Sequence, residues 1–99
     1  MFLGVYPLDK IPYISIRNKC AFIVNSQTSN LGGEHWIAVF NKPDVIKVFD
    51  PLGFYYPNLL VSKLQLLSKR IEYNKVQCQH PLTFTCGSYC LLWLKYESL

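Results

Sequence analysis

The chain has 99 residues, 51% apolar and 15% aromatic, which is long enough for one domain and too hydrophobic for a disordered chain. Ten Lys and Arg against six Asp and Glu give a net charge of +4, which permits contact with nucleic acid but does not indicate it. The sequence shows neither a signal peptide nor 18 consecutive apolar residues. We therefore expect one soluble intracellular domain over residues 1–99, whose four cysteines are free thiols, metal ligands or a nucleophile.

The first half of the chain predicts three β-strands. Residues 20–24 form an apolar run before a polar segment, which is typical of a buried strand and its loop. Residues 35–40 and 45–50 are rich in β-branched and aromatic side chains. They flank the short segment 41–44, and this arrangement predicts a hairpin with a four-residue loop.

The second half predicts two helices and a further strand. From residue 58 onward, apolar residues recur at helical spacing among basic ones, which predicts an amphipathic helix packed on the sheet. These apolar residues are Leu60, Leu64, Leu67 and Ile71. Residues 73–78 are expected to form a strand and residues 79–85 a loop. Residues 86–96 are mostly apolar and predict a closing helix that is largely buried.

The predicted hairpin brings a histidine opposite a carboxylate. If residues 41–44 form its loop, Phe40 faces Val45, and the same register places His35 directly opposite Asp50. Directly opposed residues of an antiparallel pair have Cβ atoms about 4.5–5.5 Å apart, which allows a carboxylate to accept a hydrogen bond from an imidazole. That bond would fix the tautomer and leave the other ring nitrogen free to act as a base.

Cys86 is the first residue of the predicted closing helix and directly follows the predicted loop at residues 79–85. The positive end of the helix dipole and the unpaired amides there favour a thiolate and can stabilise an oxyanion. Gln79 lies in the preceding loop, and its side-chain amide is a candidate second oxyanion donor beside the backbone N–H of Cys86. These positions predict a cysteine nucleophile with two oxyanion donors.

The same residues also allow interpretations without catalysis. His35 could be a hydrogen-bonded structural histidine, and Asp50 could begin a turn. The remaining cysteines lie among apolar residues and are expected to be small buried hydrophobic side chains; these are Cys20, Cys78 and Cys90. From residue types alone, catalysis and a structural role both remain open.

A structural zinc site is a further alternative. The chain offers four candidate ligands near its C-terminus: Cys78, His80, Cys86 and Cys90. Cysteine and histidine are the usual ligands of structural zinc. However, the first pair has a C-x-H spacing, which departs from the common pairs of cysteines separated by two to four residues. The spacing therefore favours catalysis over a metal site.

Several motifs occur in the order found in the adenovirus maturation protease family, adenain, and its relatives in large DNA transposons and other viruses. The motifs are GGEHW at residues 32–36, FDPLGF at residues 49–54, Gln79 separated from Cys86 by six residues, and CGSYC at residues 86–90. Residues 2–6 and 20–25 also resemble this family. The resemblance therefore covers nearly the whole chain.

This resemblance implies an α+β, papain-related fold, in which helices pack on a mixed sheet and the nucleophile begins a helix. It implies that Cys86 is the nucleophile, His35 the general base and Gln79 an oxyanion donor. Asp50 would orient the histidine where adenain uses a Glu. The implied activity is that of a cysteine endopeptidase that cleaves viral or mobile-element precursor proteins at Gly-containing motifs. Removal of SUMO or other ubiquitin-like proteins is the nearest alternative activity.

The family also suggests partners, cofactors and a location. The sequence itself requires no metal or cofactor. Adenain, in contrast, is activated by DNA and by a viral peptide that is disulfide-linked to one of its cysteines. Cys78 does not align convincingly with that cysteine of adenain. We expect a monomer with protein substrates and no membrane contact, in the nucleus or cytoplasm of a host cell or in the virion. Only 13 residues follow Cys86, fewer than in adenain. A truncated, inactive protease that serves as a binding module is therefore another alternative.

Overall fold

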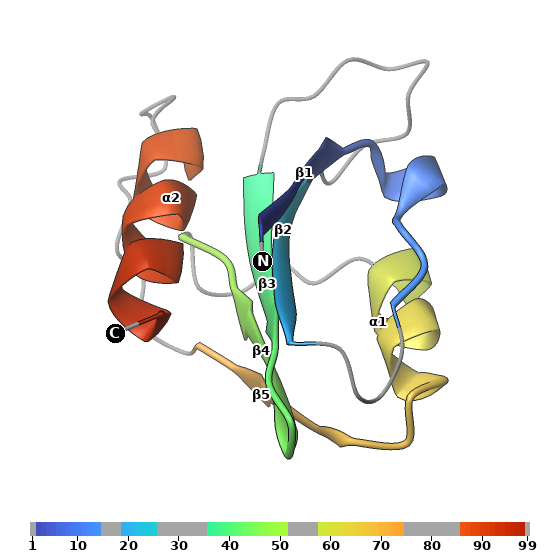
Figure 1. Cartoon of the computed structure of the whole chain (residues 1–99). Coiled ribbons are helices and arrows are strands. Elements are labelled where there is room, and N and C mark those ends of the chain that lie inside the picture. The colour runs from blue at the N-terminus through green and yellow to red at the C-terminus, as the bar shows by residue number, and fades with distance from the viewer. Residues whose placement is uncertain (1, 15–18, 26–35, 52–57, 75–85, 99) are drawn as a thin grey trace.

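The computed structural model describes residues 2–14, 19–25, 36–51, 58–74 and 86–98, with only the backbone of residues 86–88. The helices lie on both sides of a single sheet (Figure 1). The elements in order are β1 (Phe2–Tyr6), the short 3-10 helix η1 (Leu8–Lys10), β2 (Cys20–Asn25), β3 (Trp36–Asn41), β4 (Val45–Phe49), α1 (Asn58–Gln65), β5 (Arg70–Tyr73) and α2 (Cys86–Glu97). The predicted α+β class is confirmed.

The sheet is mixed and has the strand order β1-β2-β3-β4-β5. The central strand β3 is antiparallel to both β2 and β4, whereas the edge strands β1 and β5 pair in parallel with β2 and β4, respectively. Parallel pairs need crossover connections, which η1 and α1 supply. Strand β1 was not predicted, because Gly4 interrupts its pattern. Gly4 has a positive φ of 127°, and the β1–β2 register shifts between Phe2 and Val5.

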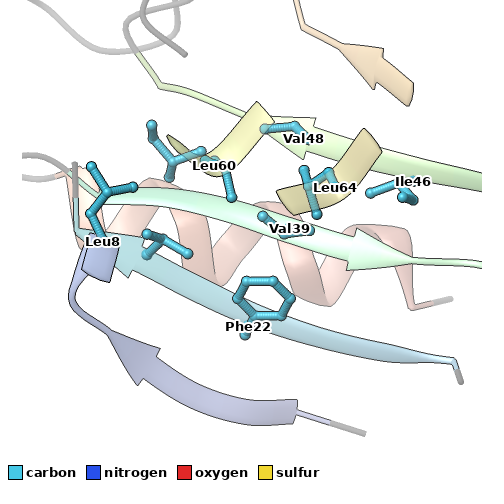
Figure 2. Close-up of a cluster of buried hydrophobic side chains, with 9 residues drawn as sticks. Leu8, Phe22, Val39, Ile46, Val48, Leu60 and Leu64 are labelled. Atoms are coloured by element: carbon cyan, nitrogen blue, oxygen red, sulfur yellow. The ribbon is translucent and has the colours of Figure 1, made fainter. Parts of the chain in front are cut away.

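One face of the sheet is covered by α1 and η1. Strand residues alternate in direction, so every second side chain of β2, β3 and β4 meets these two helices. Figure 2 shows Leu60 and Leu64 of α1 and Leu8 of η1 in one cluster with side chains of the strands. The strand residues of this cluster are Phe22, Val24, Ile37, Val39, Ile46 and Val48. The helical spacing of Leu60 and Leu64 thus predicted this packing correctly.

The opposite face is covered by α2 (Figure 1). Cys90 and Leu94 are buried there against the other set of alternating strand residues, which are Ala21, Ile23, Ala38, Phe40 and Phe49. The Trp93 ring stacks on the Phe49 ring with centroids 5.1 Å apart. The prediction that this helix is largely buried is wrong in part, because Leu91, Leu92 and Tyr96 are 53–71% exposed. Only one face of α2 meets the sheet.

The predicted helix ends earlier than expected. We expected Ile71 to continue its apolar stripe, but α1 ends at Gln65 and Ile71 belongs to β5. The backbone tightens after Gln65, and Ser68 adopts a left-handed φ of 53°, which ends the helix. A strand was predicted at residues 73–78, but β5 spans Arg70–Tyr73 and Asn74 already lies beyond it. Residues 75–78 lie outside the described part of the chain.

The hairpin register differs from the prediction by two residues. Phe40 pairs with Lys47 and not with Val45, because the turn is shorter than expected. The backbone N–H of Lys42 donates to the carbonyl of Val45 at 2.9 Å, which leaves only Pro43 and Asp44 in the loop. Buried Asn41 stays in β3 and accepts a hydrogen bond from Lys69 Nζ at 2.9 Å. Sequence alone could not reveal this partner of Asn41.

Candidate active site

Two contacts fix the direction of α2 on the sheet. Near its start, the Cys90 thiol donates to the carbonyl oxygen of Trp36, the first residue of β3, with an Sγ–O distance of 3.3 Å. At its end, Glu97 Oε1 lies 2.7 Å from Lys42 Nζ and 3.1 Å from Lys47 Nζ, at the hairpin. Helix α2 therefore runs in the same direction as β3. Its first turn lies at the end of the sheet where β3 begins and β4 finishes.

The contact of Glu97 with Lys42 and Lys47 depends on the negative charge of the Glu97 carboxylate. Burial alone would raise the pKa of this carboxyl, but the hydrogen bonds and positive charges of Lys42 and Lys47 outweigh burial and lower it. Glu97 is therefore ionised at neutral pH and accepts from both ammonium groups. Because a lowered pKa stabilises the fold only above the ordinary value of 4.5, this anchor weakens as pH falls below that value.

Cys86 is the first residue of α2, one helical turn before Cys90. A turn of α-helix rises about 5.4 Å, so the backbone of Cys86 extends beyond the Cys90–Trp36 contact toward that end of the sheet. The first amides of a helix have no intrahelical acceptors and carry the positive end of the dipole. The prediction that Cys86 begins a helix is confirmed, and its backbone is suited to stabilising negative charge.

Asp50 lies at the same end of the sheet, directly after β4, and is completely buried. Continuing the β3–β4 register by one residue brings Asp50 level with Ile37. The register from which a directly opposed Asp50–His35 pair was predicted is therefore wrong, because the shorter turn moves it by two residues, and His35 itself lies outside the described residues. A carboxyl group is rarely buried in this way without polar partners. Its burial supports a specific role and argues against a solvent-exposed turn.

The backbone of Asp50 is held by the side chain of Asn74, the residue after β5. The Asp50 N–H donates to Asn74 Oδ1 at 2.8 Å, and Asn74 Nδ2 donates to the Asp50 carbonyl at 2.7 Å. The sequence analysis missed Asn74. No spacing rule could identify it, because its partner lies 24 residues away and on another strand. A polar residue at the end of a short strand was the only signal.

The structure places two of the four predicted site residues. Asp50 is described in full and Cys86 by its backbone, whereas His35 and Gln79 lie outside the described residues. His35 directly precedes Trp36, the residue whose carbonyl contacts Cys90. The first turn of α2, the start of β3 and Asp50 thus share one end of the sheet.

Two other cysteines are buried, as predicted. Cys20 is 4% exposed, and burial raises the pKa of its thiol, although the positive N-terminus and Lys69 oppose the change. Cys90 is fully buried and its thiol already donates to Trp36. Burial therefore disfavours a thiolate at Cys20. Cys78 and His80, which the zinc alternative requires, lie outside the described residues, and the described residues form no metal-ligand cluster.

An apolar groove lies away from this site. It has a volume of about 670 Å³ and lies between residues 11–14 and the C-terminal end of α1. Leu64 and Leu67 form part of its wall. This groove belongs to the α1 side of the sheet, whereas α2 covers the other side. Within the described ranges, no helix has the length and hydropathy needed to span a bilayer.

Comparison with solved structures identifies the fold first. Two crystal structures of the ASFV pS273R protease, one with selenomethionine, resemble this chain with TM-scores of 0.61 and 0.59 at 17% and 24% identity. In both, the similarity covers 81% of this chain, and 33% and 34% of the respective protease chain. The predicted adenain-like, papain-related fold is therefore confirmed.

The sequence comparisons then identify the family. The family model described as adenovirus endoprotease matches residues 2–72, so the chain belongs to the adenovirus endoprotease family. Proteases of bovine adenovirus C serotype 10, porcine adenovirus A serotype 3 and snake adenovirus serotype 1 are 27%, 29% and 30% identical to it. Each match covers 94% of this chain and 54–56% of the relative. The chain thus spans about half the length of these curated relatives.

Proposed function

We propose that this chain is a cysteine endopeptidase. Cys86 is the nucleophile, His35 the general base, Asp50 the residue that orients His35, and Gln79 a donor to the oxyanion. Membership of a family named for a protease supports the reaction class. The observation that carries the assignment is the common location of the first turn of α2 and buried Asp50 at the end of the sheet where β3 begins.

The Cys86 thiolate attacks the carbonyl carbon of the scissile peptide bond, and His35 holds the thiol proton as an imidazolium. The oxyanion accepts hydrogen bonds from the Cys86 backbone N–H and the Gln79 side chain. His35 then gives its proton to the leaving amine, and the acyl group remains on sulfur as a thioester. In the second step His35 takes a proton from water, and the hydroxide displaces the Cys86 thiolate from the acyl carbon. The carboxylic product leaves, and the thiolate–imidazolium pair is restored.

A diagonal contact between Asp50 and His35 is compatible with the observed register. The register moved by two residues, so Asp50 lies level with Ile37, two positions after His35 in the sequence. Diagonal neighbours on adjacent strands are about 7–8 Å apart, within reach of longer side chains. We therefore retain the proposal that the Asp50 carboxylate accepts a hydrogen bond from His35, now diagonally across the hairpin and not from a directly opposed position.

For substrates, we propose viral or mobile-element precursor proteins cleaved at Gly-containing motifs, and for location the infected cell or the virion. Activation by a peptide or DNA is proposed on family grounds, and the net charge of +4 is compatible with DNA. Incubation of the chain with peptides that contain Gly-Gly is expected to release fragments, which mass spectrometry detects. Cys86→Ala should abolish cleavage.

A panel of substrates separates the alternatives. Cleavage of ubiquitin-like fusions in preference to the Gly-Gly peptides would favour the isopeptidase alternative. If neither substrate is cleaved, with or without added DNA and viral peptide, the endopeptidase proposal fails and the binding-module alternative stands. Cleavage that persists in Cys86→Ala would instead show that Cys86 is not the nucleophile.

A further inference from the structure

We infer that Asn74 is a positioning residue that sets the orientation of Asp50 for its partner in the active site. This inference rests on the proposed function, because it assumes that the Asp50 carboxylate orients His35. Asn74 itself touches neither the substrate nor the reacting atoms in this proposal. It acts only through the backbone of Asp50.

The geometry of the contact resembles a continuation of the sheet. The parallel β4–β5 ladder ends with the pair Val48 and Tyr73, and the backbone N–H of Asn74 donates to the Val48 carbonyl at 3.3 Å. Beyond that point the planar amide of the Asn74 side chain takes the place of a backbone peptide. It accepts from the Asp50 N–H and donates to the Asp50 carbonyl, at 2.8 and 2.7 Å.

Two short hydrogen bonds from one rigid amide constrain more than two independent bonds would. They fix both polar groups of the Asp50 backbone, and so the direction in which its Cα–Cβ bond points. Asp50 needs such support because it has left β4 and precedes Pro51, which has no N–H to donate. Without Asn74, both buried polar groups of Asp50 would lose these partners.

A displaced carboxylate stabilises the His35 imidazolium less well, and the thiolate of Cys86 then forms only at higher pH. We therefore predict that the pH profile of Cys86 alkylation by iodoacetamide shifts upward by about one unit in Asn74→Ala, with a rate about tenfold lower at pH 6. In Asn74→Asp, the new carboxylate can still accept a hydrogen bond from the Asp50 N–H but cannot donate one to the Asp50 carbonyl. The alkylation profile of this variant should therefore lie between those of wild type and Asn74→Ala.

Asn41→Ala is the matched control. Asn41 is also a buried asparagine, but it lies at the hairpin end of the sheet and accepts from Lys69. Its loss should lower the melting temperature without moving the alkylation profile. A wild-type profile in Asn74→Ala, or an equal shift in Asn41→Ala, would overturn the inference. If Asn74→Ala does not fold, the inference is tested on Asn74→Asp. A wild-type alkylation profile in Asn74→Asp would then overturn it. Alkylation of wild-type Cys86 that does not depend on His35 would instead overturn the proposed function.

Discussion

Replacement of Asp50 by asparagine is expected to lower kcat for a Gly-Gly peptide by about 10³–10⁴-fold, because an amide in place of an orienting carboxylate favours the wrong imidazole tautomer. The fold should persist. The bonds between Asp50 and Asn74 use the backbone atoms of Asp50, and the two side chains have nearly the same volume. Peptide hydrolysis followed by mass spectrometry measures the loss, and a thermal melt checks the fold.

Asp44→Asn is the matched control for this substitution. Asp44 lies exposed in the hairpin turn, at the opposite end of β4 from Asp50. The same chemical change there should leave kcat within about twofold, since an exposed surface substitution has little effect on a distant site. Equal activity of the two variants would mean that Asp50 is buried for structural reasons alone.

The largest expected effect on stability is at Leu60. Leu60→Ala should lower the free energy of unfolding by about 2–5 kcal/mol, which includes the lost burial and the cavity that remains. A domain of this size has only about 5–15 kcal/mol to lose, so the melting temperature should fall by at least about 10 °C. Leu60 is completely buried between α1 and the strands (Figure 2). Thermal unfolding followed by circular dichroism measures the change.

Leu66→Ala provides the comparison, because Leu66 follows α1 directly and is 82% exposed. It should change the free energy of unfolding by no more than about 0.5 kcal/mol. If the two variants melted at the same temperature, α1 would not be packed on the sheet as described.

The central part of the fold could be predicted from sequence because its patterns are local. The apolar run at residues 20–24 and the hairpin strands have strong β-propensity, and Leu60 and Leu64 show helical spacing. The edge strands could not be predicted in this way. Strand β1 contains Gly4, which weakens its β-pattern. Strand β5 has only four residues, and its Ile71 lies at helical spacing from the apolar residues of α1, so the sequence pattern assigned Ile71 to the helix. Both edge strands form because they pair in parallel with β2 and β4, and a local sequence pattern does not contain that information.

Within the candidate site, the structure tests only the start of the helix at Cys86 and the position of Asp50. Asp50 was identified by the hairpin pattern, but its register depended on a two-residue turn and on the buried contact between Asn41 and Lys69. Asn74 was missed because its role arises from a contact between β5 and the end of β4. The helix that starts at Cys86 was predicted correctly, since a loop followed by a long apolar run marks its beginning.

Selective alkylation tests most directly whether Cys86 is an activated nucleophile. Wild type and His35→Ala are each treated with limiting iodoacetamide at neutral pH, and the modified cysteines are mapped by mass spectrometry. Cys86 should react first, while buried Cys20 and Cys90 remain unmodified. An unactivated thiol is only about 3% ionised at pH 7, so His35→Ala should slow the reaction about 10–30-fold. Equal labelling of all cysteines, or a Cys86 rate that does not depend on His35, would contradict the assignment.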